Sequence, residues 1–251
     1  PTLVIDYDGE AHKFFKKWGN RILEEIKPKA VVVISAHWQT SGGINGETPI
    51  IYDFGGFSEE LYRQKYHGKG SPKLAERIVN LLSPFQATIN TRRGFDHGLW
   101  VPLKVAIPEP KDIPIIQVSL TSRASYEYHI KVGQALAPLR DEGVLLIGSG
   151  SLVHNLRDLF VGASETQFYT ETFDKDAGEY VTKYSGKERE EKAIGLINHP
   201  LLRKAHPTDE HLVPLHVMVG ASGNDQGKKI HEEFGSGISM SAIEFCGDVK
   251  F

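Results

Sequence analysis

The chain has very little cysteine: Cys246 is the only one in 251 residues. A single thiol excludes an intrachain disulfide, and a lack of disulfides is typical of proteins from a reducing compartment. The first residues do not resemble a signal sequence either, because Asp6, Asp8 and Glu10 interrupt any apolar stretch there. We therefore expect a cytoplasmic protein.

Long hydrophobic runs and an excess of positive charge are also missing. The longest apolar runs, residues 30–36 and 144–147, are far shorter than the roughly 20 residues that a membrane-spanning helix needs. The formal net charge is −3, from 29 Lys and Arg against 32 Asp and Glu, which offers no basic field for a polyphosphate backbone. The sequence predicts neither a membrane protein nor a nucleic-acid-binding protein.

Strand and helix patterns alternate along the chain, whose hydrophobic content of 40% is ordinary for a globular protein. Runs rich in aliphatic and β-branched residues predict buried strands over 30–35, 113–120 and 143–148. Helical spacing of apolar residues predicts a helix over 10–26, which Pro28 ends. Further expected elements are a strand over 50–53, helices after Ser58 and from Ser71-Pro72, a helix over 126–140, polar helices over 165–195, a buried helix over 209–221 and a strand over 238–245.

This order of elements predicts an α/β fold, a sandwich with a central, mostly parallel or mixed sheet flanked by helices. We find no internal repeat and no linker rich in proline or serine, so we expect a single domain over residues 1–251.

The most informative residues are histidines at the ends of predicted strands. His37 and His154 each follow a short aliphatic strand, and ligands of open α/β sheets bind beyond the carboxyl ends of the strands. Imidazoles gathered there can bind a metal or transfer protons near neutral pH. His97 lies beside Gly98, which permits the close approach of a ligand, and His211 begins an apolar segment. These features indicate a metalloenzyme.

Structural interpretations of the same residues stay open at this point. His37 can be a histidine at the edge of the core, and Asp96 precedes His97 without necessarily pairing with it, because sequence neighbours often point apart. If a helix follows Asp209, His216 turns away from His211 and either packs against the protein or lies at the surface. The loop 148–151 is neither a P-loop nor a nucleophile elbow, but its small residues and backbone amides suit an anionic or oxygen-rich ligand.

Five motifs, in order along the chain, together resemble the 4,5-DOPA dioxygenase extradiol family, the class III (protocatechuate 4,5-dioxygenase-like) ring-cleavage enzymes. The resemblance extends from Pro1 to Phe245. The motifs are Ser35-Ala36-His37-Trp38, Tyr52-Asp53-Phe54-Gly55-Gly56-Phe57, Asp96-His97-Gly98-Leu99-Trp100-Val101-Pro102-Leu103, residues 148–156 and residues 210–216 with His211, Pro214 and His216.

The resemblance implies an Fe(II) enzyme that uses O2 to open a catechol ring, such as that of DOPA, next to its hydroxyls. It implies that His37 and His211 are metal ligands, that His154 is the acid/base residue and that His97 is a pocket residue near substrate or dioxygen. Glu210 and Asp209 remain lesser candidates for a carboxylate ligand. Zn(II) prefers the same kinds of ligand and can occupy such a site.

The sequence departs from the family pattern at its start. Residues 1–6 resemble the continuation of a motif whose histidine is another metal ligand, so that histidine is expected just before Pro1 and is absent from this chain. We expect a longer natural chain rather than a loss of the ligand. Two alternatives are a zinc-dependent hydrolase with the same histidines and a non-catalytic binding protein on the same scaffold.

Overall fold

The computed structural model describes residues 1–40, 44–45, 50–122 and 124–246. The chain forms two compact units, each described by itself below: Pro1–Ser122 with Pro138–Ser149, and Arg123–Ala137 with Gly150–Phe251. The expectation of a single domain stays a prediction. No helix among the described residues combines the length and the apolar character needed to cross a bilayer.

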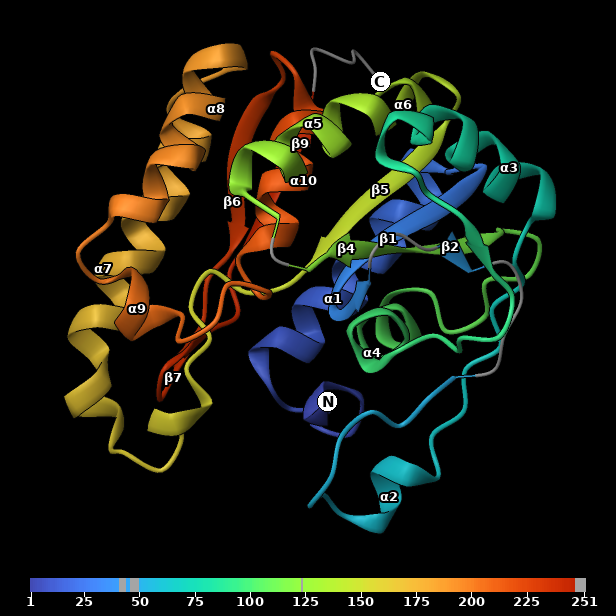
Figure 1. Cartoon of the computed structure of the whole chain (residues 1–251). Coiled ribbons are helices and arrows are strands. Elements are labelled where there is room, and N and C mark those ends of the chain that lie inside the picture. Colours follow the sequence, from blue (N-terminus) through green and yellow to red (C-terminus); the bar gives the residue numbers. More distant parts are fainter. Residues whose placement is uncertain (41–43, 46–49, 123, 247–251) are drawn as a thin grey trace. The chain divides into compact units, whose positions relative to one another are not determined.

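The first unit is built on a five-stranded sheet with the order β3-β2-β4-β1-β5. β1 (Ala30–Thr40) lies between β4 (Ile115–Thr121) and β5 (Val144–Ser149) and pairs in parallel with both (Figure 1). β2 (Ile44–Asn45) runs antiparallel to β4, and β3 (Ile89–Asn90) pairs in parallel with β2. The sheet is therefore mixed, with helices around it, and the predicted α/β class is confirmed.

Helices of the first unit bury the apolar face of this sheet. α1 (Glu10–Arg21) continues into a wider π-type turn, Ile22–Ile26, and packs against α4 (His97–Ala106). The contact is close, because a Cβ on Gly19 would lie 1.9 Å from the carbonyl oxygen of Ala106. The other helices are α2 (Glu59–Tyr62), α3 (Pro72–Leu81) and α6 (Pro138–Asp141), with 3-10 turns at Thr2–Val4 and Ser83–Phe85.

The second unit consists of helices and two small antiparallel sheets. α5 (Tyr126–Leu136) lies along α10 (Val213–Ser222), and β6 (Gln226–His231) pairs with β9 (Ala242–Cys246) (Figure 1). Its remaining elements are the helices α7 (Ala163–Thr182), α8 (Gly186–Gly195) and α9 (Leu202–Ala205), the paired strands β7 (Phe234–Gly235) and β8 (Ile238–Ser239), and 3-10 turns at Leu156–Asp158 and Leu196–Asn198.

Two glycines allow the close packing of α5 on α10. A Cβ on Gly133 would lie 1.9 Å from the carbonyl oxygen of Val217, and a Cβ on Gly220 would lie 2.0 Å from that of Ile130. Real Cβ atoms do not come so near to backbone atoms, so the two helices reach this spacing only because both positions lack a side chain.

Several predicted elements differ from those observed. The expected strand over 50–53 is wrong, because these residues form no strand and contribute a single isolated β-bridge, from Ile50 to Phe95. The helix expected over 126–140 is divided before Pro138, since proline cannot donate the helical hydrogen bond. The expected strand over 238–245 is two strands, β8 and β9.

Candidate active-site residues

Two groups of side chains among the described residues have the composition of a metal site. The first cluster is His37, Asp53 and His97 in the first unit, and the second cluster is His154, Glu210 and His211 in the second unit. Within each cluster the potential ligand atoms lie within 4.8 Å of one another. Two imidazoles and one carboxylate are the donor set of many non-haem Fe(II) oxygenases, so the chemistry of both clusters fits a divalent transition metal.

His37 lies inside β1, in an irregular part of the strand. Ser35 pairs with Ser119 on β4, but the next paired residue of β1 is Gln39, which opposes Leu120. The three intervening residues have no partner in the register with β4, as in an extended β-bulge. The sequence predicted His37 just past the end of the strand. In the structure β1 pairs again beyond His37, so this half-buried residue lies in the irregular part of the strand itself.

A buried network around Asp96 holds the backbone of His37. The hydroxyl of Ser35 accepts a hydrogen bond from the His37 amide (3.2 Å) and donates to Asp96 (2.7 Å). Arg93 donates to the His37 carbonyl (3.0 Å) and lies 3.4 Å from the Asp96 carboxylate, to which Gln117 also donates. Burial raises the pKa of Asp96, and the bonds from Ser35 and Gln117 oppose that rise. The network fixes both sides of the His37 peptide.

Gly98 has a different role from the predicted one. A Cβ at this position would lie 2.4 Å from Oγ of Ser35 and 3.0 Å from Cδ2 of His37. The space beside Gly98 is therefore filled by the protein's own side chains rather than kept for a ligand, and the glycine allows His37 to lie against the start of α4.

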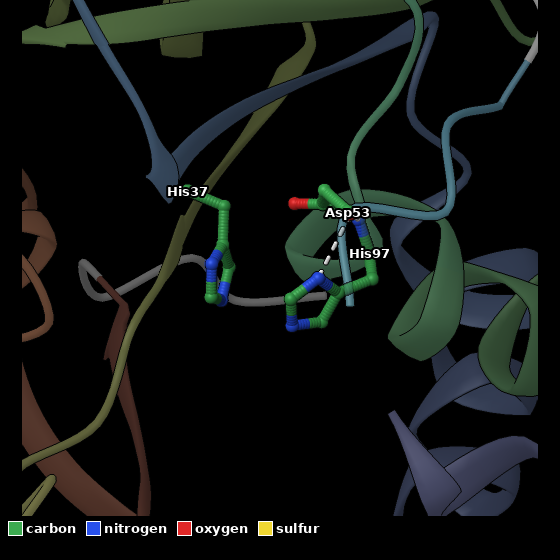
Figure 2. Close-up of side chains that lie close together, drawn as sticks. All are labelled: His37, Asp53 and His97. Carbon is green, nitrogen blue, oxygen red and sulfur yellow. Dashed lines mark hydrogen bonds and ion pairs between the residues drawn. The ribbon is translucent and has the colours of Figure 1, made fainter. Parts of the chain in front are cut away.

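His97 is paired with Asp53, not with its neighbour Asp96 (Figure 2). Oδ1 of Asp53 accepts hydrogen bonds from the backbone amide and from Nδ1 of His97, each at 2.9 Å. Burial alone would raise the pKa of Asp53, but the bonds from His97 outweigh it and the pKa lies below its ordinary value. The ring centroid of His97 is 3.8 Å from that of His37, so these two predicted site residues are brought together.

In the second cluster, the rings of His154 and His211 stack with 3.4 Å between their centroids and 5° between their planes. Nδ1 of His211 lies 3.3 Å from Oε1 of Glu210, which also accepts a 2.8 Å bond from Thr208. The bond to His211, the main cause, and the bond from Thr208 lower the pKa of Glu210 to about 2, although burial opposes them. Glu210 is therefore an anionic partner of the His211 imidazole near neutral pH.

Backbone hydrogen bonds hold the segment of His154 on two sides. The His154 amide donates to Ala205 (2.9 Å), and the Asn155 amide donates to Gly237 (2.8 Å). The carbonyl of Val153 accepts from the Ser239 amide at 3.0 Å. His154 thus lies on an anchored segment rather than on an open loop.

The glycine–serine loop before His154, residues 148–151, makes hydrogen bonds and close contacts within the protein. The Ser151 amide donates to the carbonyl of His211 (2.8 Å), and the Ser151 hydroxyl donates to Val153 (2.6 Å). A Cβ on Gly150 would lie 2.3 Å from the same His211 oxygen. The expectation that this loop's amides suit an anion is therefore wrong for Ser151, whose amide positions the segment of His211 instead.

The remaining histidines of the terminal cluster are structural. His216 is fully buried, its ring nitrogens lie 3.3 Å and 3.0 Å from the carbonyls of Leu212 and Ala193, and it stacks on Tyr126. Of the two places expected for His216, packing or the surface, the structure shows packing in the core. His206 is also buried, with Nε2 2.7 Å from the Leu152 carbonyl.

The structure thus groups the four predicted residues in pairs, His37 with His97 and His154 with His211. The assignment of His37 and His211 as metal ligands stays a prediction. The role of Asp53 was missed: it lies 44 residues before His97, and no local pattern connects them.

Comparison with known proteins identifies the family. Residues 4–244 match the family described as the catalytic LigB subunit of aromatic ring-opening dioxygenase. The chain is 42% identical over 246 residues to a 4,5-DOPA dioxygenase extradiol of Beta vulgaris, covering 95% of this chain and 90% of that protein. It is 36% identical over 239 residues to the protein of the same name from Escherichia coli K12, covering 93% and 86%.

A solved structure agrees with this assignment. The crystal structure of an uncharacterized protein from Escherichia coli K12 superposes with a TM-score of 0.72 at 31% identity, covering 91% of each chain. The family is metal-dependent, and the first cluster offers a His/Asp/His set of potential ligands. The chain therefore belongs to the LigB family of aromatic ring-opening dioxygenases, and it is an oxidoreductase with an extradiol dioxygenase function.

Proposed function

We propose that the chain uses Fe(II) and O2 to open the ring of a catechol such as DOPA, and that it acts in the cytoplasm. The observation that carries the proposal is the similarity, over 93–95% of the chain, to relatives named 4,5-DOPA dioxygenase extradiol. The lone Cys246 fits the reducing compartment.

In this proposal His37 and His211 are metal ligands. Metal-bound histidines usually donate their second ring N–H to a carboxylate or carbonyl, which orients the ring and makes it a better ligand. The Nδ1 contact of His211 with Glu210 fits that pattern, because a proton on Nδ1 leaves the lone pair on Nε2. The two-sided fixation of the His37 peptide supports the same role, since a ligand held by its own scaffold loses little freedom on binding.

Neutral imidazoles suit iron and zinc alike, so the native metal is part of the proposal. Iron(II), when bound, lowers the pKa of the catechol hydroxyls and supplies an electron to O2, whereas zinc(II) can supply only the first effect.

His154 is proposed as the acid/base residue. Ring opening requires a base that removes a proton from the substrate and an acid that later returns one, and imidazole can do both near neutral pH. The stack on His211 and the anchored backbone hold the His154 ring in one place, which proton transfer at hydrogen-bond distance requires. His97 is proposed as a pocket residue near the substrate or dioxygen.

The test is an assay of the full-length protein, loaded anaerobically with Fe(II), against a panel of catechols. We expect a yellow semialdehyde product with one O2 consumed per ring, and no product until O2 is admitted. Product formation that continues without O2 would favour a metal-dependent hydrolase instead. Binding of catechols without any turnover, in protein with a full complement of iron, would favour a non-catalytic binding protein.

A further inference from the structure

We propose that Asp53 is a positioning residue for His97, which fixes the imidazole tautomer that the substrate meets. This inference rests on the proposed function, in which His97 lies near the substrate. One carboxylate oxygen, Oδ1 of Asp53, accepts from both the backbone amide and the ring Nδ1 of His97, each at 2.9 Å (Figure 2). Two bonds from one residue to one oxygen fix the ring relative to its own backbone.

The chemistry of the pair decides the tautomer. An ionised carboxylate only accepts hydrogen bonds, so the ring proton of a neutral His97 is held on Nδ1. Nε2 then carries the lone pair and is an acceptor. A substrate group that meets Nε2 must therefore be a donor, and the hydroxyl of a catechol is such a donor. Asp53 thereby prepares His97 to recognise a ring that still carries a protonated hydroxyl.

Neighbouring groups hold both members of the pair in place. The segment before Asp53 is anchored at Ile51, whose amide donates to Phe95 (2.8 Å) and whose carbonyl accepts from the indole of Trp100 (3.1 Å). Phe54 meets the His97 ring edge to face, with 5.4 Å between centroids and 88° between planes. The side chains of His97 and Asp53 are 14% and 22% exposed, so their bond is partly shielded from water, although Asp53 as a whole residue is exposed.

Asp53 has a second, structural effect that the test must separate. His97 is the first residue of α4, and the side chain of Asp96 makes no capping bond, so Asp53 caps this helix through the His97 amide. Replacement of Asp53 by alanine is therefore expected to lower the Tm as well as the activity.

The first measurement reads the tautomer directly and needs no turnover. In protein labelled with 15N-histidine, NMR of the His97 ring, identified by its absence in His97→Gln, should show the proton on Nδ1. Asp53→Asn should keep this tautomer, because the amide of His97 holds Oδ1 of the new side chain in place. Asp53→Ala should lose it. A proton on Nε2 in the wild-type protein, or an unchanged tautomer in Asp53→Ala, would overturn the proposal.

The second measurement is a double-mutant cycle on kcat/KM, corrected for folded, metal-loaded protein. Asp53→Ala should lower kcat/KM by about tenfold or more, which is the lower end of the effect that loss of an orienting partner has at metal-bound histidines. The same change should have almost no effect in the His97→Gln background, because Asp53 acts through His97. Equal effects in both backgrounds would show a merely structural role and sink the proposal.

The exposed Glu60→Gln is the matched control in the same segment, and it should leave both the tautomer and kcat/KM unchanged. If the full-length enzyme opens no catechol ring, the proposed function fails while the tautomer measurement still decides the role of Asp53.

Discussion

At the scale of single residues, the sequence neighbours Asp96 and His97 have different partners and different roles. Asp96 points into the core, where Ser35, Gln117 and Arg93 surround its carboxylate. His97 points to Asp53. A buried carboxylate that orders the backbone thus lies directly beside an imidazole that is proposed to meet the substrate.

The acid/base assignment predicts the behaviour of His154→Asn. Asparagine has no group that titrates near neutral pH, so we expect kcat to fall by about 10²–10⁴-fold. The metal content should not change, because His154 is not proposed as a ligand. Steady-state kinetics with metal analysis on the same sample check both expectations, with His67→Gln, an exposed histidine, as the control. Full turnover with metal bound would remove His154 from the mechanism, and loss of the metal would make it a ligand instead.

The buried His216 predicts a pH dependence of stability. Burial lowers its pKa in the folded protein to about 4, although the carbonyls of Ala193 and Leu212 oppose the shift, against an ordinary value of 6.5. Between these values the unfolded chain binds the proton more readily, so this contribution to stability is complete above pH 6.5 and is lost as the pH falls toward 4.

Urea unfolding of His216→Gln from pH 7 to pH 4 measures that contribution. We expect the slope of unfolding free energy against pH to fall by up to about 1.4 kcal/mol per pH unit relative to the wild type. An unaltered slope in His216→Gln would mean that His216 is not kept neutral by the fold.

The residues that sequence alone could identify are those with a local signal. His37 and His154 follow aliphatic runs, and His97 and His211 lie in recognisable motifs. Asp53 has no such signal as a partner of His97, because the loop that holds Asp53 and the start of α4 meet across 44 residues of sequence. A contact between residues so far apart in sequence depends on the tertiary structure, and the residue spacing within either motif does not predict it.

At the scale of elements, the contact of α5 with α10 should tolerate no side chain at Gly220. Alanine there would place its Cβ 2.0 Å from the Ile130 carbonyl, so the helices must move apart, at a cost of about 1–3 kcal/mol or more. Gly195, at the end of α8, has nothing within 4 Å of a built Cβ. Gly195→Ala should therefore be neutral or stabilise by up to about 1 kcal/mol.

Urea denaturation of Gly220→Ala and Gly195→Ala compares their free energies of unfolding with that of the wild type. If Gly220→Ala unfolded at the same urea concentration as the wild type, the two helices would not be held at backbone contact.

Some of the strands have a clear local sequence signal and others do not. The three parallel strands were predicted within a few residues, because each has an aliphatic run typical of a parallel sheet, although β5 is only partly buried. β6 was missed, since its sequence, Gln-Gly-Lys-Lys-Ile-His, is polar and only its pairing with β9 makes it a strand. β1 extends beyond its predicted end because pairing with β4 resumes after the irregular segment, which no local pattern shows.

At the scale of the whole molecule, metal identity should separate binding from catalysis. Protein stripped with a chelator and refilled with Zn(II) should bind catechols but consume no O2, because zinc has no accessible redox state. Refilling the same sample with Fe(II) under anaerobic conditions should restore turnover once O2 is added. Elemental analysis, catechol titration and an oxygen electrode supply the readouts, and turnover by zinc protein without measurable iron would contradict the redox role.

The bulge in β1 has a consequence for how this scaffold can change. Pairing with β5 covers Ala30–Ser35, and pairing with β4 skips from Ser35 to Gln39, so the ladder does not depend on the three residues around His37. A different side chain at His37 can therefore leave the ladder on either side intact, whereas its neighbours Ala36 and Trp38 are each only 3% exposed and belong to the core. A different metal-binding side chain could therefore replace His37 without redesign of the sheet.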